Sequence, residues 1–251
     1  MAGHSHSANI RHTKNRRDEK RGKVFSKLGK ALMAAARLGG GDADANPRLR
    51  LAVEKAKAVN MPKDTIERAI LKGTGQLEGQ SLEELTYEGY GPGGVALLIE
   101  VLTDNKNRTA PEIRKLLDVH GGNLAGNGAV AWMFSPKGVI LVKQEEIEED
   151  DLMELALESG AEDVRAEDGM YEVTCAPSDL AAVSDAIEAR GIQPEMAEVS
   201  QIPQNTVKLD ASLARRVLKL LDVLDDHEDV QTVHANYDID DQLMAELRQA
   251  E

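Results

Sequence analysis

The sequence predicts an α+β multidomain protein in which an N-terminal helical bundle precedes two ferredoxin-like α/β domains, one inserted in the other. Three observations lead to this prediction. Apolar residues recur at helical spacing from Val24 to Lys72, whereas strand-like alternation dominates after Glu84. Strand–helix–strand units then recur along the remaining chain, and the sign of the net charge reverses near residue 76.

These observations divide the chain of 251 residues into three expected domains. Its hydrophobic content of 41% is enough to bury more than one core. The expected domains are a basic arm and helical domain over residues 1–76, a split α/β domain over residues 77–136 and 204–251, and an inserted α/β domain over residues 137–203.

Three helices are expected in the first domain. The first begins near Val24, with lysines on the arc opposite its apolar face, and the three glycines from Gly39 end it. Asn46 is expected to cap the second helix, with Pro47 at the first helical position. Pro62 is expected to open the third helix.

The two α/β domains follow from alternating strand and helix patterns. The glycine-rich residues 87–94 precede a strand and open no helix, so they are expected to form a turn between domains and not a dinucleotide-binding loop. The split domain is expected to comprise a strand over 94–103, a helix capped by Asn107, a strand over 128–134, a strand over 206–209, a helix over 211–225 and a strand over 230–236. The inserted domain is expected to comprise a strand over 139–142, a helix over 151–158, strands over 163–165 and 171–174, a helix over 179–189 and a strand over 195–199.

Positive charge is concentrated at the start of the chain. Residues 1–76 contain 17 Lys plus Arg and 7 Asp plus Glu, a net charge of +10; the remainder, with 13 and 37, carries −24. Such segregation favours a basic part that faces a polyanion. The residues predicted to bind nucleic acid are Arg11, Lys14, Arg16, Arg17, Lys20, Arg21, Lys23, Lys27, Lys30 and Arg37.

Lysine and arginine on an arm and one helix face suit phosphates, because each such contact releases condensed counterions. Base stacking is expected to be minor, since Phe25 is the only aromatic residue in the first 76 and belongs to the apolar face.

No catalytic residue, metal site or cofactor is predicted. The histidines of the arm, His4, His6 and His12, have no neighbouring cysteine, and the sequence lacks a Walker lysine, an H-E-x-x-H motif and a nucleophile elbow. The single cysteine, Cys175, excludes an intrachain disulfide and is expected to be buried in a strand.

Two further features leave alternatives open. Asp104, Asn105 and Arg108 are candidates for lining a cleft between domains, and a hydrolase using Asp104, Arg108 and His120 would require these groups to converge. The acidic runs 145–151 and 222–229 lack the ligand pattern of a calcium loop. We expect them to be solvated helix ends, with a protein partner or restraint of the basic arm as the alternatives.

The order of short motifs resembles the YebC/PmpR family along the whole chain. The motifs are MAGHS at 1–5, AARLGGGD at 35–42, NPRLR at 46–50, MPKD at 61–64, YEGYGPGG at 87–94, LTDNKNRT at 102–109 and GGNLAGNGAVAWMF at 121–134. The resemblance implies a helical domain followed by two α/β domains, and regulation of gene expression. Similar members are described as DNA-binding transcriptional regulators. Others, including the mitochondrial translational activator of cytochrome c oxidase, act at the ribosome.

We therefore predict a non-enzymatic, nucleic-acid-binding regulator, in the first instance a DNA-binding transcriptional regulator. A ribosome- or RNA-associated translation factor is the alternative. The expected partners are DNA or ribosomal RNA and the ribosome, while the sequence leaves the oligomeric state open. No apolar run reaches the roughly 18 residues that span a bilayer, and no secretory or organellar presequence is evident, so a cytoplasmic location without membrane contact is expected.

Overall fold

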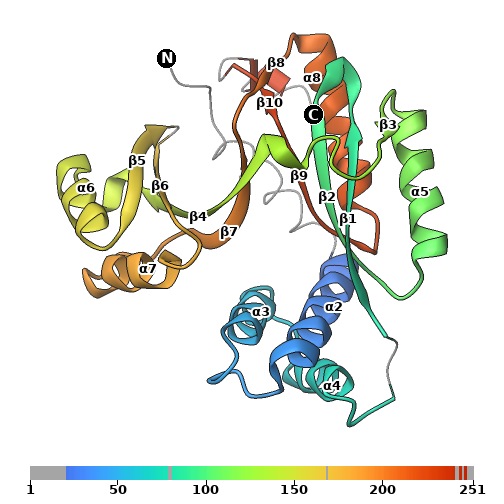
Figure 1. Ribbon diagram of the computed structural model, residues 1–251. Helices are drawn as coiled ribbons and strands as arrows, with labels where there is room; N and C mark the ends of the chain where they lie inside the picture. Colours follow the sequence, from blue (N-terminus) through green and yellow to red (C-terminus); the bar gives the residue numbers. More distant parts are fainter. Residues whose placement is uncertain (1–20, 79–80, 168, 241–242, 245, 248–251) are drawn as a thin grey trace. The chain divides into compact units, whose positions relative to one another are not determined.

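The computed structural model describes residues 21–78, 81–167, 169–240, 243–244 and 246–247. The described residues up to 130 and those from 210 to 235 form one compact unit; those from 131 to 209 and from 236 onward form a second (Figure 1). The first unit contains a helical bundle and an α/β part, and the second contains a further α/β sheet. The predicted α+β multidomain architecture is confirmed.

The bundle consists of three helices, α2 (Arg21–Gly39), α3 (Pro47–Ala58) and α4 (Lys63–Gly73). They pack through the apolar faces that the sequence predicts, and Leu32, Leu49 and Ile66 lie in their common core. The helix α2 ends where Gly40 adopts a φ of 86° and donates its amide hydrogen to the carbonyl of Ala36 at 2.9 Å. Glycine adopts this left-handed conformation without a steric penalty.

Asn46 caps α3 and ties it to the end of α2. Its side-chain oxygen accepts a hydrogen bond from the amide of Leu49 at 3.1 Å, and its side-chain nitrogen donates to the carbonyls of Ala35 and Gly40 at 2.9 Å each. Asn46 is buried, so these bonds satisfy a polar group that would otherwise be costly to desolvate. The predicted N-cap is confirmed.

Replacing Gly73 with alanine is expected to destabilise the bundle by about 1–3 kcal/mol. A Cβ at this position would lie 2.4 Å from the carbonyl oxygen of Met33 and 2.8 Å from the Cβ of Ala36, so α2 and α4 would have to separate. The matched control is Gly29→Ala, whose Cβ would meet no atom within 4 Å and which gains helix propensity. Urea unfolding followed by circular dichroism compares them, and equal midpoints would contradict the close approach.

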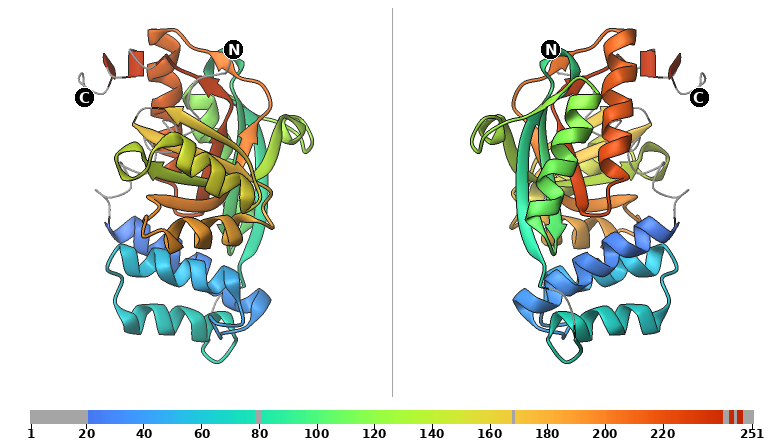
Figure 2. Two further views of the ribbon diagram at one scale, coloured as in Figure 1. Left: turned by 90° about the vertical axis from the view of Figure 1, so that its left-hand side faces the viewer. Right: turned by 90° about the vertical axis from the view of Figure 1, so that its right-hand side faces the viewer.

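The α/β part of the first unit comprises β1 (Glu83–Tyr90), β2 (Ala96–Thr103), α5 (Lys106–Val119), β3 (Asn123–Leu124), α8 (Ala211–Asp225) and β9 (Val230–Ala235). The strands form an antiparallel sheet of order β3-β1-β2-β9. The helices α5 and α8 lie side by side on one face of this sheet, as the right-hand view of Figure 2 shows. This arrangement brings the end of α8 close to the start of α5.

The strand predicted over residues 128–134 does not form, and a turn followed by the short 3-10 helix η2 (Ala131–Met133) takes its place. The alternation is misleading because Val130 is fully buried whereas Trp132 is 62% exposed, so the two do not share a face. The carboxylate of Glu88 accepts hydrogen bonds from two amides of this loop, including that of Val130 at 2.7 Å. These two backbone amides therefore have hydrogen-bond acceptors although no neighbouring strand pairs with the loop.

The glycine-rich residues 87–94 do not form the predicted turn between domains. Their first half completes β1, and the 3-10 turn η1 (Pro92–Gly94) connects β1 to β2 as a hairpin. The amide of Gly91 donates to the carbonyl of Val95 at 2.8 Å. The sequence did not reveal β1 because its outer half is polar and exposed, which weakens the alternation.

The split domain is therefore not built from two strand–helix–strand halves. Its first two strands pair as a hairpin, and the strand predicted over 206–209 belongs to the second unit. There, β8 (Val207–Lys208) pairs in parallel with β10 (Tyr237–Asp238) in a separate two-stranded sheet. A strand pattern shows that a segment is extended but does not specify its partner, which explains the error.

The larger sheet of the second unit has the ferredoxin-like order predicted for the inserted domain. Its elements are β4 (Phe134–Lys143), α6 (Glu149–Glu158), β5 (Ala161–Glu167), β6 (Met170–Cys175), α7 (Leu180–Ala189) and β7 (Met196–Pro203). The strand order is β5-β6-β4-β7, with every neighbouring pair antiparallel. Cys175 is fully buried in the core that α6 and α7 cover, and burial raises the pKa of its thiol. Within the described residues, no helix combines the length and the apolar composition needed to span a membrane.

Candidate nucleic-acid interface

Part of the predicted interface lies outside the described residues. The helix α2 carries Lys23, Lys27, Lys30 and Arg37, whose side chains the structure places. The predicted residues outside the described part are Arg11, Lys14, Arg16, Arg17, Lys20 and the side chain of Arg21, together with the arm histidines His4, His6 and His12.

The lysines of α2 face residues 225–229, which comprise the last residue of α8 and the segment that joins it to β9; they are called the acidic turn below. Their spacing of four and then three residues places the lysines on one face of the helix. Each one forms an ion pair with an aspartate of the turn. The pairs are Lys23 with Asp226 at 3.5 Å, Lys27 with Asp225 at 3.1 Å, and Lys30 with Asp229.

Backbone carbonyls at the end of α8 also accept hydrogen bonds from these lysines. Lys23 donates to the carbonyl of Asp226 at 3.2 Å, and Lys27 donates to that of Asp225. The last carbonyls of a helix carry partial negative charge, which aspartates at the same end increase. Since α8 has no basic residue in its last turn, α2 supplies the positive charge that this helix end lacks.

Asp229 is the buried centre of the network. Its side chain is 2% exposed, and its Oδ2 accepts hydrogen bonds from Thr109 Oγ1 at 2.7 Å and Arg108 Nη2 at 2.9 Å. Burial alone raises the pKa of Asp229, but hydrogen bonds from Lys30, Thr109 and Arg108 outweigh it and hold that pKa far below its usual range. Asp229 is therefore a charged, fully bonded link between the bundle and the sheet.

Of the three ion pairs, only the one nearest the start of α2 is exposed; the side chains of Lys27 and Asp225 are 11% and 19% exposed. The side chains of Lys30 and Asp229 are 16% and 2% exposed, whereas those of Lys23 and Asp226 are 45% and 38% exposed. Exposed ion pairs are screened by water and contribute at most about 1 kcal/mol. The inner pair is thus structural, and the outer pair is weak enough for other anions to replace.

Arg37 lies near the other end of α2 and contacts the segment before β1. Its Nη1 donates to Ser81 Oγ at 2.8 Å and to the carbonyl of Leu82 at 3.0 Å. A guanidinium group offers five donors, so these contacts leave donors on Arg37 that can reach a phosphate.

The residues predicted to line a cleft lie at the start of α5. Asn105 is the N-cap of α5, because its side-chain oxygen accepts from the amides of Asn107 and Arg108 at 3.2 Å each; the prediction that Asn107 is the cap is wrong. Arg108 bridges Asp104 and Asp229 at 2.9 Å each. The hydrogen bond and charge of Asp229, and to a smaller extent those of Asp104, raise the pKa of Arg108.

His120 follows the opposite end of α5, and its Nδ1 bonds to the carbonyl of Leu116 at 2.8 Å. A helical rise of 1.5 Å per residue places it about 18 Å along the axis from Arg108. The three groups of the hydrolase alternative therefore do not converge.

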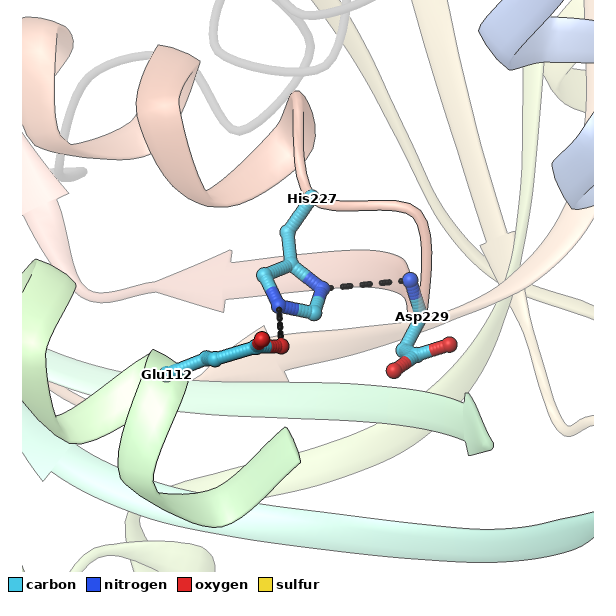
Figure 3. Close-up of side chains that lie close together, drawn as sticks. All are labelled: Glu112, His227 and Asp229. Atoms are coloured by element: carbon cyan, nitrogen blue, oxygen red, sulfur yellow. Dashed lines mark hydrogen bonds and ion pairs between the residues drawn. The ribbon is translucent and has the colours of Figure 1, made fainter. Parts of the chain in front are cut away.

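Glu112, His227 and Asp229 bring potential metal-ligand atoms within 4.8 Å of one another (Figure 3). The amide of Asp229 donates to His227 Nδ1 at 3.1 Å, so His227 Nε2 carries the proton and lies 3.0 Å from Glu112 Oε2. Both ring nitrogens are thus engaged, and cations already hold the Asp229 carboxylate. The cluster stabilises the acidic turn and offers no open ligand set.

A second group of cations lies on the outer face of α4. Arg68 and Lys72 are exposed and one helical turn apart, so they share a face. Within the described part of the chain, neither has a carboxylate within 4 Å. The nearby Lys63 is paired with Glu67 at 3.6 Å across an exposed helix turn.

The acidic turn itself was not predicted as part of the interface. Residues 222–229 were expected to form a solvated helix end, yet residues 225–229 contact α2; the alternative of restraint of the basic arm concerns residues outside the described part. A signal was available in the sequence. Aspartates near the C-terminus of a helix interact unfavourably with the helix dipole, and nearby cations offset this effect. The partner was not evident, because 198 residues separate Lys27 from Asp225.

Two family models match the chain. The model described as TACO1/YebC protein N-terminal domain matches residues 5–76, and that described as TACO1/YebC second and third domain matches residues 82–237. A probable transcriptional regulatory protein of Desulforapulum autotrophicum is 54% identical, over 97% of this chain and 98% of the relative. One of Desulfatibacillum aliphaticivorans is 55% identical, over 98% of this chain and 100% of the relative.

A solved structure is also similar. The crystal structure of a conserved hypothetical protein from Aquifex aeolicus aligns with a TM-score of 0.80 and 45% identity. The alignment covers 88% of this chain and 91% of that one.

Proposed function

The chain belongs to the TACO1/YebC family, and from this premise we propose that it is a non-enzymatic regulator of gene expression that binds DNA and acts on transcription. The relatives named above are called probable transcriptional regulatory proteins, which supports the regulatory role. DNA binding and its site are our proposals.

Segregation of charge is the observation that carries the proposal. Residues 1–76 have a net charge of +10 in a chain whose total is −14. A protein with one basic segment and an acidic remainder is attracted to a polyanion through the basic segment, and this attraction orients the protein as it approaches. The acidic remainder is repelled by phosphate, so only the basic end approaches the nucleic acid.

The proposed interface combines the arm with the bundle. In this proposal the residues from Arg11 to Arg21, together with Lys23, Lys27 and Arg37, contact phosphates, whereas Lys30 is held by the buried Asp229. Arg68 and Lys72 extend the surface onto α4. Phe25, the one aromatic side chain of the bundle, packs against its core, so stacking on bases contributes little. The contacts are therefore to the nucleic-acid backbone, and selectivity arises from arginine contacts or nucleic-acid shape.

Binding of the intact chain to a short DNA duplex is expected to fall steeply with salt. If about five phosphates are engaged, the affinity drops by roughly several hundred-fold between about 50 and 200 mM salt, because each contact releases counterions. Fluorescence anisotropy with labelled DNA measures this slope. Absence of binding to DNA and to an RNA stem-loop at low salt would refute the proposal.

Crosslinking in cells followed by sequencing identifies the polymer. Enrichment on chromosomal DNA near promoters supports regulation of transcription. Enrichment on ribosomal RNA without promoters would instead assign the protein to translation. The latter candidate has one physical observation in its favour: residues 77–251 carry −24, a charge more easily accommodated at one site of a folded RNA assembly than along a duplex.

A further inference from the structure

We propose that Asp225 and Asp226 of the acidic turn are internal substitutes for phosphate, which occupy Lys27 and Lys23 of α2 in the free protein and are displaced there by bound nucleic acid. This inference rests on the proposed function and adds a mode of regulation to the same site. The polyanion binds Lys23 and Lys27 only after these two aspartates are released, so the turn lowers the affinity and suppresses weak, non-specific binding.

The geometry of the turn supports this substitution. Asp225 and Asp226 present carboxylates and backbone carbonyls to Lys27 and Lys23, so each ammonium group receives oxygens of both kinds. Phosphate oxygens offer ammonium groups the same charge-assisted hydrogen bonds. A lysine can therefore exchange one set of oxygens for the other without moving its helix.

The burial of the three pairs determines the order of exchange. The pair of Lys23 and Asp226 is exposed, whereas those of Lys27 with Asp225 and of Lys30 with Asp229 are largely enclosed. Lys23 is also the described lysine closest in sequence to the basic arm. Nucleic acid held by the arm therefore meets the weakest pair first, then that of Lys27, while Asp229 stays in place as the structural anchor.

Removing the substitute is expected to increase affinity. In Asp225→Asn with Asp226→Asn, the lysines lose their competing charges, and we expect the affinity for a short DNA duplex to rise about three- to tenfold at low salt. The affinity also falls more steeply with salt, by the equivalent of about one to two additional phosphate contacts. The reason is that Lys23 and Lys27 bind phosphates without first releasing carboxylates.

The matched control is Glu154→Gln with Asp185→Asn, which changes the net charge equally. Both residues are exposed on α6 and α7 of the second unit. A second test adds Lys23→Gln and Lys27→Gln to the Asp225→Asn, Asp226→Asn variant and is expected to abolish the gain. This combination distinguishes exchange at α2 from a general effect of charge.

The outcomes separate this inference from the proposed function. A gain in the turn variant that is absent from the control and lost in the quadruple variant supports the exchange. Equal affinities of wild type and turn variant, equal gains in turn variant and control, or a gain that survives loss of the lysines would overturn it while leaving nucleic-acid binding intact. If neither wild type nor turn variant binds DNA or an RNA stem-loop, the proposed function fails and the exchange fails with it. Thermal unfolding verifies that the variants are folded.

Discussion

Asp229→Ala is expected to lower the free energy of unfolding of the first compact unit by about 3–5 kcal/mol, because it removes one partner from a buried ionic network. Lys30 and Arg108 would lose a shared counterion, and the Thr109 hydroxyl would lose its acceptor at 2.7 Å. Hydrogen exchange of α2 and β9, together with urea unfolding followed by circular dichroism, measures the loss. We expect the bundle of α2 to α4 to unfold independently of the sheet that contains β9.

Asp226→Ala is the control for this prediction. It removes a carboxylate from the same turn, but its pair with Lys23 is exposed, so its cost is at most about 1 kcal/mol. Hydrogen exchange of β4 and β6, which belong to the second unit, reports whether that unit is unaffected. Equal destabilisation by both substitutions would show that Asp229 has no special structural role.

The same carboxylate makes stability depend on pH. Because the folded-state pKa of Asp229 is lowered, its contribution is fully present above the unfolded pKa of about 3.9 and is lost as the pH falls toward the lower folded value. Wild type is therefore expected to lose more stability between about pH 5 and pH 2 than Asp229→Asn, which has no such carboxylate. Parallel acid-unfolding curves for the two proteins would contradict the network.

Neutralising the arm is expected to produce the largest loss of nucleic-acid binding. In the combined variant Lys14→Gln, Arg16→Gln, Arg17→Gln and Lys20→Gln, each lost phosphate contact lowers the salt slope by about one and weakens binding to every sequence alike. We expect roughly a hundredfold or greater loss at low salt, measured by anisotropy with a labelled duplex.

A control with the same change in net charge tests whether location matters. Lys115, Arg190, Lys208 and Lys219 are exposed and lie outside the basic first domain, so replacing all four with glutamine lowers the charge equally. We expect this variant to bind within a few-fold of wild type. Equal losses in both variants would show that total charge, and not the arm, governs binding.

Local features of the fold were predictable from the sequence. The helices of the bundle, the Asn46 cap and the ferredoxin-like inserted domain follow from periodicities and capping preferences that act over a few residues. The family assignment was also accessible, because its motifs are contiguous in the chain. By contrast, β1 was missed, since a strand with a polar, exposed half leaves little alternation to detect.

The sequence by itself determined where helices form, which end of the chain is basic, and that Cys175 is buried. Only the tertiary structure decided which strands pair and where the α2 lysines direct their charge. The physical reason is that helical periodicity is a local property, whereas an ion pair such as that of Lys27 and Asp225, 198 residues apart, exists only once the chain has closed a long loop and placed the end of α8 against α2.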